Sequence, residues 1–422
     1  MTQPDWLPFD GKHVWHPYTQ HGSSPPPVPI ERAQGASLYD VNGRAIIDAI
    51  SSWWVILHGH CEPAIASAIA EQATTLDQVI FAGFTHEPAA RLAQALCHRL
   101  SPPLERVFLS DNGSTAVEVA LKMAIQYWAL RGQPKNLIAA LHNGYHGDTF
   151  GAMSASSRGL FTRPFEAHLF QVARLPDPST EDVVAAFQDL IETRGRELAA
   201  IIVEPLLLGA GGMRPWSADS LQEIQRIART HRVLLIADEV LTGFGRTGPL
   251  FASLAADVVP DIICLSKGLT GGFLPLGATV TSDEIFRAFL SDDPGRAFFH
   301  GHSFTANPIS CAAACASLAL LDDHSAQRRR SIESAHHRHL SKLSTHPLVL
   351  SPRVVGTIAA FDAGSTTDYL HPLGLELRQY ALQQGVLIRP LGNVVYILPP
   401  YCISEADLEL VYATITAFLE RV

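Results

Sequence analysis

The sequence predicts an α/β fold, with a large domain built on a mainly parallel sheet covered by helices and a smaller α+β domain built from both termini. Short apolar runs alternate with helical patterns, at 107–109, 137–139, 201–203, 234–236, 262–265 and 278–280. These runs are apolar throughout, which is typical of strands buried on both faces. The length of 422 residues, 47% of them hydrophobic, allows a large core and more than one domain.

The first two predicted units differ in their patterns. The N-terminal segment, residues 1–50, is loop-rich, but Asn42-Gly43 lies between two apolar runs and favours a β-hairpin. Residues 51–320 carry the alternation of strands and helices, including a helical pattern over 219–230, and are predicted to be the large domain.

The third unit, residues 321–422, is predicted to be the small domain, which the N-terminal segment joins. It opens with a charged, His-rich helical pattern over 323–343 and closes with a helix over 405–419. Alternating segments near 356–361 and 394–398 are expected between them as strands.

Composition excludes several classes of protein. The formal net charge is −10 and the only basic run is Arg328-Arg329-Arg330, so nucleic-acid binding is not expected and a small-molecule substrate fits better. The 6 cysteines form no CxxC pair, which indicates a reducing compartment rather than a disulfide framework. Residues 1–9 lack the features of a signal peptide, and no uncharged apolar run reaches membrane-spanning length. We therefore expect a cytoplasmic protein.

Lysine is scarce in this chain, and one lysine has an unusual setting. Lys12, Lys122, Lys135 and Lys342 lie in tail, loop or helical contexts. Lys267 instead follows the apolar run 262–265 and is flanked by glycines. Partial burial at a strand end lowers the pKa of an ammonium group and favours a nucleophilic amine that can form a Schiff base. An ordinary strand-end lysine reaching water is the alternative.

A second strand end carries a candidate phosphate site. Ser110-Asp111-Asn112-Gly113-Ser114-Thr115 follows the run 107–109 and precedes a helical pattern. The free N–H groups and the dipole of a helix N-terminus attract phosphate. The simpler alternative is a helix cap supplied by Ser114 or Thr115.

Two further strand ends supply an acid and an aromatic ring. Asp238 ends the run 234–236 and is expected to point into the crevice where α/β folds bind ligands, whereas the adjacent Glu239 is expected to face solvent. Tyr145, in the glycine-bracketed loop 143–148, can lie flat over a ring. His142 and His146 in the same region suggest a metal only weakly, because a third ligand is missing.

Together these groups suit pyridoxal 5′-phosphate. Its aldehyde needs a lysine, its phosphate a helix N-terminus, its ring a stacking partner and its pyridinium nitrogen a carboxylate. Strands of one parallel sheet end at the same edge, so Lys267 and Asp238 are expected to share one crevice.

On these residues the chain resembles the class III aminotransferases of pyridoxal-phosphate fold type I, nearly end to end. The motif over 238–248, followed by Ser266-Lys267-Gly268, is highly specific for that class. Finer similarity lies in the segments 15–18, 51–54, 143–148, 209–213 and 388–390. These imply the subgroup that aminates 8-amino-7-oxononanoate with S-adenosylmethionine as amino donor, in biotin biosynthesis.

The resemblance also implies residue roles. It makes Lys267 the Schiff-base lysine and proton shuttle, and Asp238 the partner of the ring nitrogen. The remaining implied groups are the phosphate loop Gly113 and Ser114, the stacking ring Tyr145, the substrate contacts Trp53, Tyr18 and Arg389, and Asp148 beside Tyr18. Of the tryptophan pair, Trp53 is expected to contact substrate and Trp54 to pack in the core.

A loop at 300–304 implies a homodimer with shared active sites. In this fold, Gly301, His302 and Ser303 match a loop that reaches the phosphate and substrate of the neighbouring subunit. Many members have proline and threonine where this chain has His302 and Ser303. The serine keeps a hydroxyl for phosphate, but the change leaves lysine open as the alternative amino donor.

Other functions remain as alternatives. The nearest is another class III ω-aminotransferase, acting on ornithine, acetylornithine or 4-aminobutyrate, against which Tyr18 and the Trp53-Trp54 pair argue. More distant alternatives are a nucleotide-binding module without catalysis and a metal hydrolase that uses the many histidines.

Overall fold

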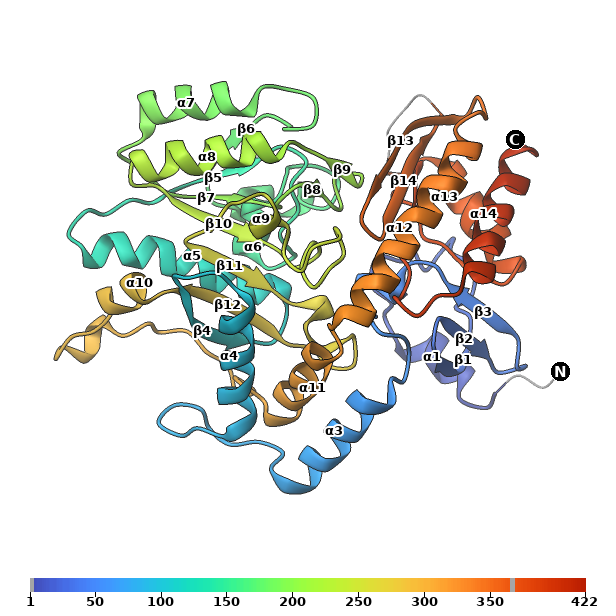
Figure 1. Ribbon diagram of the computed structural model, residues 1–422, viewed down its shortest axis with the longest axis horizontal. Coiled ribbons are helices and arrows are strands. Elements are labelled where there is room, and N and C mark those ends of the chain that lie inside the picture. The colour runs from blue at the N-terminus through green and yellow to red at the C-terminus, as the bar shows by residue number, and fades with distance from the viewer. Residues whose placement is uncertain (1–3, 365–368) are drawn as a thin grey trace.

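The structure, a computed structural model, describes residues 4–364 and 369–422 (Figure 1). The predicted N-terminal segment and small domain therefore each include a few residues outside the described ranges, namely 1–3 and 365–368. The centre of the molecule is a 7-stranded sheet in the order β4-β12-β11-β10-β7-β5-β6. Its strands are β4 (Leu104–Ser110), β5 (Leu137–Leu141), β6 (Val172–Leu175), β7 (Leu198–Val203), β10 (Leu234–Asp238), β11 (Ile262–Leu265) and β12 (Gly277–Ser282).

Most strand pairs in this sheet are parallel, which confirms the predicted fold class. Only β12 runs against its neighbours β11 and β4. The apolar runs of the sequence correspond to strands, but the edge strand β6 was not predicted. It contains Arg174 and is mostly half-buried, because an edge strand has one neighbour and needs no continuous apolar run.

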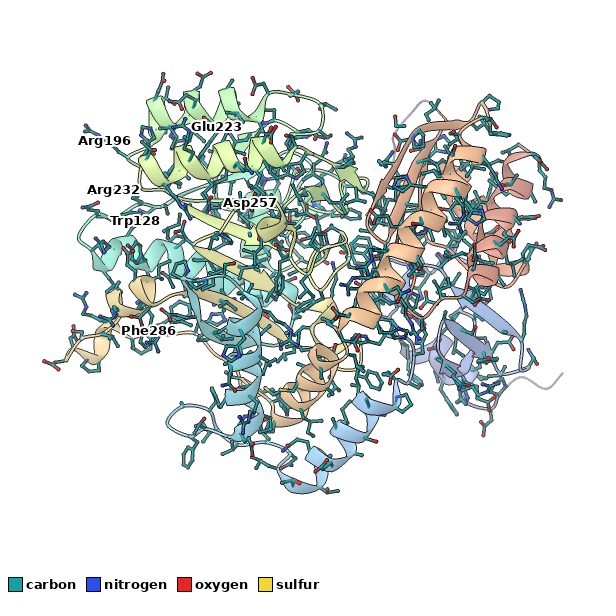
Figure 2. All side chains as sticks on the ribbon, viewed as in Figure 1. Trp128, Arg196, Glu223, Arg232, Asp257 and Phe286 are labelled. Atoms are coloured by element: carbon teal, nitrogen blue, oxygen red, sulfur yellow. The ribbon has the colours of Figure 1, made fainter. Side chains whose placement is uncertain are left out.

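Helices cover both faces of the sheet. Alternate strand residues face opposite sides of the sheet. Ile138 and Ala140 therefore pack with α5 (Gly113–Leu130), while Leu137 and Leu141 pack with α7 (Val183–Arg194) and α8 (Ala218–Thr230). The helices of this part are α2 (Ser51–Trp54), α3 (Pro63–Thr75), α4 (Glu87–Arg99), α5 (Gly113–Leu130), α6 (Phe150–Ala155), α7 (Val183–Arg194), α8 (Ala218–Thr230), α9 (Ala252–Ala255), α10 (Asp283–Ala288) and α11 (Pro308–Ala319). Charged side chains such as Glu223 line the outer surface of α8 (Figure 2). Short 3-10 turns lie at η1 (Arg163–His168), η2 (Lys267–Thr270) and η3 (Pro294–Arg296), and a small hairpin at β8 (Leu207–Leu208) and β9 (Arg214–Pro215).

The two ends of the chain meet in a second structural region. The predicted hairpin is present as β2 (Ser37–Asp40) and β3 (Ala45–Asp48), and β15 (Val386–Leu387) pairs with β3 in parallel. The other elements are α1 (Leu7–His13), β1 (Ile30–Gln34), α12 (Asp323–Leu343), β13 (Val349–Val355), β14 (Ile358–Ala363), α13 (Pro372–Gln383), β16 (Val394–Ile397) and α14 (Glu405–Leu419). The bounds of α12 and α14 agree with the sequence-based ones, whereas the three domain boundaries themselves stay predictions.

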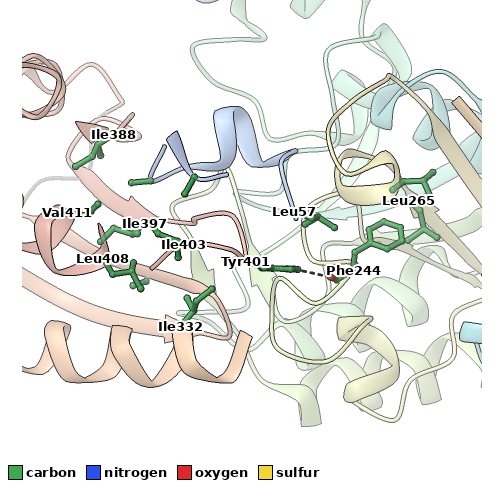
Figure 3. Packing of buried hydrophobic residues seen from close by; sticks show 14 of the residues in the cluster. Leu57, Phe244, Leu265, Ile332, Ile388, Ile397, Tyr401, Ile403, Leu408 and Val411 are labelled. Atoms are coloured by element: carbon green, nitrogen blue, oxygen red, sulfur yellow. Dashed lines mark hydrogen bonds between the residues drawn. The ribbon is translucent and has the colours of Figure 1, made fainter. Parts of the chain in front are cut away.

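An apolar cluster joins the two regions. Tyr401 lies between Leu57 and Phe244 on the side of the large sheet and Ile332 and Ile403 on the side of the C-terminal elements (Figure 3). Its hydroxyl donates a 2.9 Å hydrogen bond to the carbonyl of Phe244. Burial of this kind contributes roughly 25 cal/mol per Å² of apolar surface, so the regions are held together by the same force that forms each core.

No helix in the described ranges is long and apolar enough to cross a membrane.

Candidate active site

Strand register brings Lys267 and Asp238 together. Strand β10 runs parallel to β11 with Asp238 beside Cys264, and Lys267 comes after β11 with only Ser266 between them. The backbone of Lys267 has a φ of 41°, in the left-handed region where a non-glycine residue is strained. Burial lowers the pKa of its ammonium group to about 8, against the opposing attraction of Asp238. The Nζ atom lies 4.5 Å from the ring centre of Trp54.

Asp238 is held by two donors. Its side chain is 4% exposed, and it accepts a 2.7 Å hydrogen bond from Nδ1 of His146 and a 3.1 Å bond from the N–H of Val240. The other ring nitrogen of His146 is buried without a partner among the described residues. Sequence reasoning missed this role of His146, since it treated the residue only as a candidate metal ligand. Its position directly after Tyr145, in a loop at a strand end, was the available signal.

Glu204 is a second buried acid that sequence reasoning missed. Its carboxylate accepts a 2.9 Å hydrogen bond from the N–H of Tyr145 and a 3.0 Å bond from the N–H of Gly209. Burial raises its pKa to about 7. Glu204 therefore ties the loop that carries Tyr145 to the loop 209–213. The signal was its place directly after β7, which matches the place of Asp238 at the end of β10.

The candidate phosphate site is the N-terminus of α5. The N-cap residue is Asn112, whose side chain accepts from the N–H of Thr115 at 3.0 Å, while the Thr115 hydroxyl accepts from the N–H of Asn112 at 3.1 Å. Thr115 therefore takes part in the cap, as the alternative allowed, and Ser114 does not. This leaves the hydroxyl of Ser114 to accept a 3.2 Å bond from the N–H of Asp148. A Cβ on Gly147 would lie 2.1 Å from that hydroxyl, so this close approach of the two loops requires glycine.

These groups line one cavity of about 640 Å³, which we call the lysine cavity. It is lined by Lys267, Asp238, Tyr145, His146, Glu204, Asp148, Trp54, Asn112, Gly113 and Ser114, among others. The set contains each group that pyridoxal 5′-phosphate requires: an amine, a carboxylate, an aromatic face and a helix N-terminus. The residues present therefore fit that cofactor.

A second cavity, the arginine cavity, has a volume of about 950 Å³ and shares no lining residue with the lysine cavity. Arg44, Arg378 and Arg389 line it, as do Tyr18 and Trp53. The guanidinium carbon of Arg389 lies 4.6 Å from the ring centre of Trp53. Trp53 is 36% exposed and Trp54 is 5% exposed, so the expected core position of Trp54 is correct, although this residue also lines the lysine cavity.

Tyr18 connects the two cavities. Its ring packs edge-on against Trp53 with centroids 5.4 Å apart. Its hydroxyl donates a short hydrogen bond to Asp148, which lines the lysine cavity. Burial, together with this bond, raises the pKa of Tyr18 to about 12, so the phenol stays protonated near neutral pH.

Two sequence-predicted features lie elsewhere. Gly301, His302 and Ser303 do not line either cavity of this single chain, and Ser303 accepts a 2.8 Å bond at its carbonyl from Gln78. Glu239, expected to face solvent, is fully buried and accepts bonds from the N–H groups of Ala252 and Ser253, each at 2.8 Å. That expectation was wrong because Glu239 binds the first N–H groups of the short helix α9 rather than standing free.

Known proteins resemble this chain over nearly its full length. The family model for class III aminotransferases matches residues 18–419. The adenosylmethionine-8-amino-7-oxononanoate aminotransferase of Synechococcus elongatus is 51% identical, over 97% of this chain and 99% of that protein. The protein of the same name from Mycobacterium leprae is 40% identical, over 95% and 93%.

Solved structures agree. The crystal structure of adenosylmethionine-8-amino-7-oxononanoate aminotransferase from Methanocaldococcus jannaschii superposes with a TM-score of 0.94 at 33% identity, covering 99% of this chain and 98% of that one. A pyridoxal-phosphate-bound amine transaminase from an uncultivated Pseudomonas species gives a TM-score of 0.89 at 30% identity, covering 97% and 98%.

Proposed function

Because this chain belongs to the class III aminotransferases, we propose that it transfers an amino group from S-adenosylmethionine to 8-amino-7-oxononanoate and forms 7,8-diaminononanoate, in biotin biosynthesis. The full-length similarity to relatives that carry this activity in their names supports the proposal. The observation that carries it is the pairing of a reactive amine in one cavity with the guanidinium of Arg389 in the next.

The cofactor of this class is pyridoxal 5′-phosphate, and this chain offers a partner for each part of it. When bound, it supplies an aldehyde that captures amines and a ring that stabilises negative charge on the substrate carbon. The N–H groups of Gly113 and Ser114 at the start of α5 would hold its phosphate, and Tyr145 would lie against its ring. Asp238, held in place by His146, would keep the ring nitrogen protonated.

Lys267 is the proposed general acid–base. Its Nζ would take the proton from the substrate carbon that bears the amino group and deliver it to the aldehyde carbon of the cofactor. A pKa of about 8 suits this task, because it lies near the working pH and both forms of the amine are populated. Trp54 and the surrounding apolar residues exclude water from the amine.

The arginine cavity would receive the far end of the keto acid. Arg389 would bind the carboxylate and Trp53 would pack along the methylene chain, while Tyr18 and Asp148 orient the group near the reacting carbon. The ketone and the carboxylate of 8-amino-7-oxononanoate are separated by five methylene groups. A substrate of that shape suits two cavities that Tyr18 links better than does an amino acid whose only carboxylate is on the reacting carbon.

We also propose a homodimer in which Gly301, His302 and Ser303 complete the partner's lysine cavity. Large apolar residues are exposed on and beside this loop: Ile80 63%, Phe84 61%, Phe299 73% and Phe304 65%. Such a surface favours a protein partner that covers it. The bond between Gln78 and Ser303 joins the two loops that bear these residues.

We also propose a cytoplasmic location, which is inferred from the cysteine usage.

A donor assay tests the proposed reaction. The purified holoenzyme is incubated with 8-amino-7-oxononanoate and either S-adenosylmethionine or lysine, and the diamine is measured by mass spectrometry. We expect diamine with S-adenosylmethionine and none with lysine. If diamine forms only with lysine, the amino donor is lysine and not S-adenosylmethionine. If no diamine forms with either donor, the proposed reaction is overturned.

A further inference from the structure

The arginine cavity contains a cation that the proposed reaction has not used. Arg378, on α13, lines this cavity together with Arg389. Within residues 4–364 and 369–422, neither guanidinium forms an ion pair with a carboxylate. Arg44, which lines the same cavity, differs because its guanidinium donates to the carbonyl of Leu382.

Helix packing directs Arg378 towards Arg389. A Cβ on Gly374, in α13, would lie 1.9 Å from the carbonyl oxygen of Gly392 and 3.3 Å from Cβ of Pro390. The helix therefore rests against the segment that follows Arg389. Arg378 is four residues beyond Gly374, which places it on the same face of the helix, one turn along.

The electrostatics of the cavity favour an anion. The side chain of Arg378 is exposed overall, and the pKa of its guanidinium is lowered by partial burial and then by the charge of Arg389. Two neighbouring cations without a counter-ion repel each other, and a carboxylate bound between them would relieve that repulsion. Leu375 and Leu382 also line the cavity and suit the methylene chain of a fatty-acid-like ligand.

We propose that Arg378 is a second carboxylate-binding residue, which acts with Arg389 on the substrate carboxylate that is remote from the reacting carbon. The identity of the ligand, a keto acid with its carboxylate five methylene groups from the ketone, rests on the proposed function. An α-carboxylate would remain in the lysine cavity, which neither arginine lines. Arg378 is thus a specificity residue for the acceptor and not for the donor.

Heptanoate tests this without any turnover, because it reproduces the carbons from the carboxylate to the reacting position. Its binding to the holoenzyme is measured by calorimetry beside that of heptanamide, which lacks the charge. We expect Arg378→Gln to weaken heptanoate binding about tenfold and to leave heptanamide binding unchanged. Arg378→Lys should restore part of the loss, since it keeps the charge but not the two-pronged geometry.

The matched control is Arg421→Gln, which removes one positive charge near α13 but outside the cavity, where Arg421 lies over the ring of Tyr380. It should bind heptanoate as the wild type does. The inference is overturned if Arg378→Gln binds heptanoate with wild-type affinity, or if its affinity for heptanamide falls as much as its affinity for heptanoate. It is also overturned if Arg421→Gln loses as much heptanoate affinity as Arg378→Gln.

Kinetics with the keto acid separate this inference from the proposed function. We expect Arg378→Gln to raise KM for 8-amino-7-oxononanoate about tenfold and to leave the donor half-reaction unchanged. If the wild type does not convert the keto acid but its heptanoate binding depends on Arg378, the proposed function fails and the carboxylate site stands. If the wild type converts it and Arg378→Gln behaves normally in both assays, the inference fails alone.

Discussion

The lysine cavity and the arginine cavity are built in different ways. The lysine cavity lies at the ends of buried parallel strands, and its acids already have hydrogen-bond partners: His146 bonds Asp238, and Glu204 accepts from two backbone N–H groups. The arginine cavity is formed by the N-terminal segment, α13 and the residues after β15. Its arginines on α13 and at position 389 have no carboxylate partner in the described ranges.

This difference assigns proton transfer to the lysine cavity and substrate recognition to the arginine cavity. Proton transfer needs groups fixed before the substrate arrives, and a buried sheet edge supplies rigid positions for them. Substrate recognition gains from charges that are left unsatisfied until the ligand pairs with them. Substitutions in the lysine cavity should therefore impair both half-reactions, whereas those in the arginine cavity should impair one.

The largest effect is expected for Lys267→Ala. Loss of the amine should lower turnover by a factor on the order of 10⁴ or more in both half-reactions. The visible absorption band of the lysine-bound cofactor should vanish as well, and a spectrum of the purified variant checks this. A variant that keeps the band and the activity would contradict the assignment.

Asp238→Asn should come next, with kcat lowered on the order of 10²- to 10³-fold in both directions. The shape of the side chain is kept but its negative charge is lost, so the ring nitrogen would no longer be held protonated. Single-turnover kinetics of each half-reaction give the measurement. A loss confined to the half-reaction with the keto acid would show that Asp238 serves substrate recognition. It would contradict the division of roles between the two cavities.

Arg389→Gln should affect the acceptor alone. We expect kcat/KM for 8-amino-7-oxononanoate to fall on the order of 10- to 100-fold, because one charge-assisted pair is lost. The half-reaction with S-adenosylmethionine should stay within about twofold of the wild type. Equal losses in both half-reactions would mean that Arg389 binds the donor as well.

Glu204→Gln tests the carboxylate that joins two loops. An amide can accept from only one of the N–H groups of Tyr145 and Gly209, so the other is left unsatisfied. We expect the holoenzyme to lose about 1–3 kcal/mol of stability and to show a lower thermal midpoint. Exposed Glu223, which pairs with Arg226, gives the control Glu223→Gln, for which no change of midpoint is expected.

The pH dependence of cofactor capture tests the pKa of Lys267. The folded-state pKa of about 8 is below the usual lysine value, so the reactive neutral amine forms at lower pH than in a free lysine. The rate at which apoenzyme takes up added pyridoxal phosphate should rise about tenfold per pH unit below about 8 and level off above it. A rate that keeps rising to about pH 10 would indicate an ordinary, hydrated lysine.

The sequence predicted the lysine cavity better than the arginine cavity. Lys267, Asp238 and Gly113 follow apolar runs, and the ends of parallel strands meet at one edge, so local patterns were sufficient. Arg378 lies on a helix whose packing against residues 390–392 depends on contacts distant from it in sequence. His146 and Glu204 were missed because their importance lies in hydrogen bonds to other loops, which no periodicity records.

The most direct test of the separation is heptanoate binding by Lys267→Ala and Arg389→Gln, measured side by side with their visible spectra. We predict that Lys267→Ala loses the visible band and binds heptanoate with wild-type affinity, while Arg389→Gln keeps the band and loses heptanoate binding. If both variants lost both properties, the two cavities would form a single coupled site, which would contradict the division of chemistry and substrate selection between them.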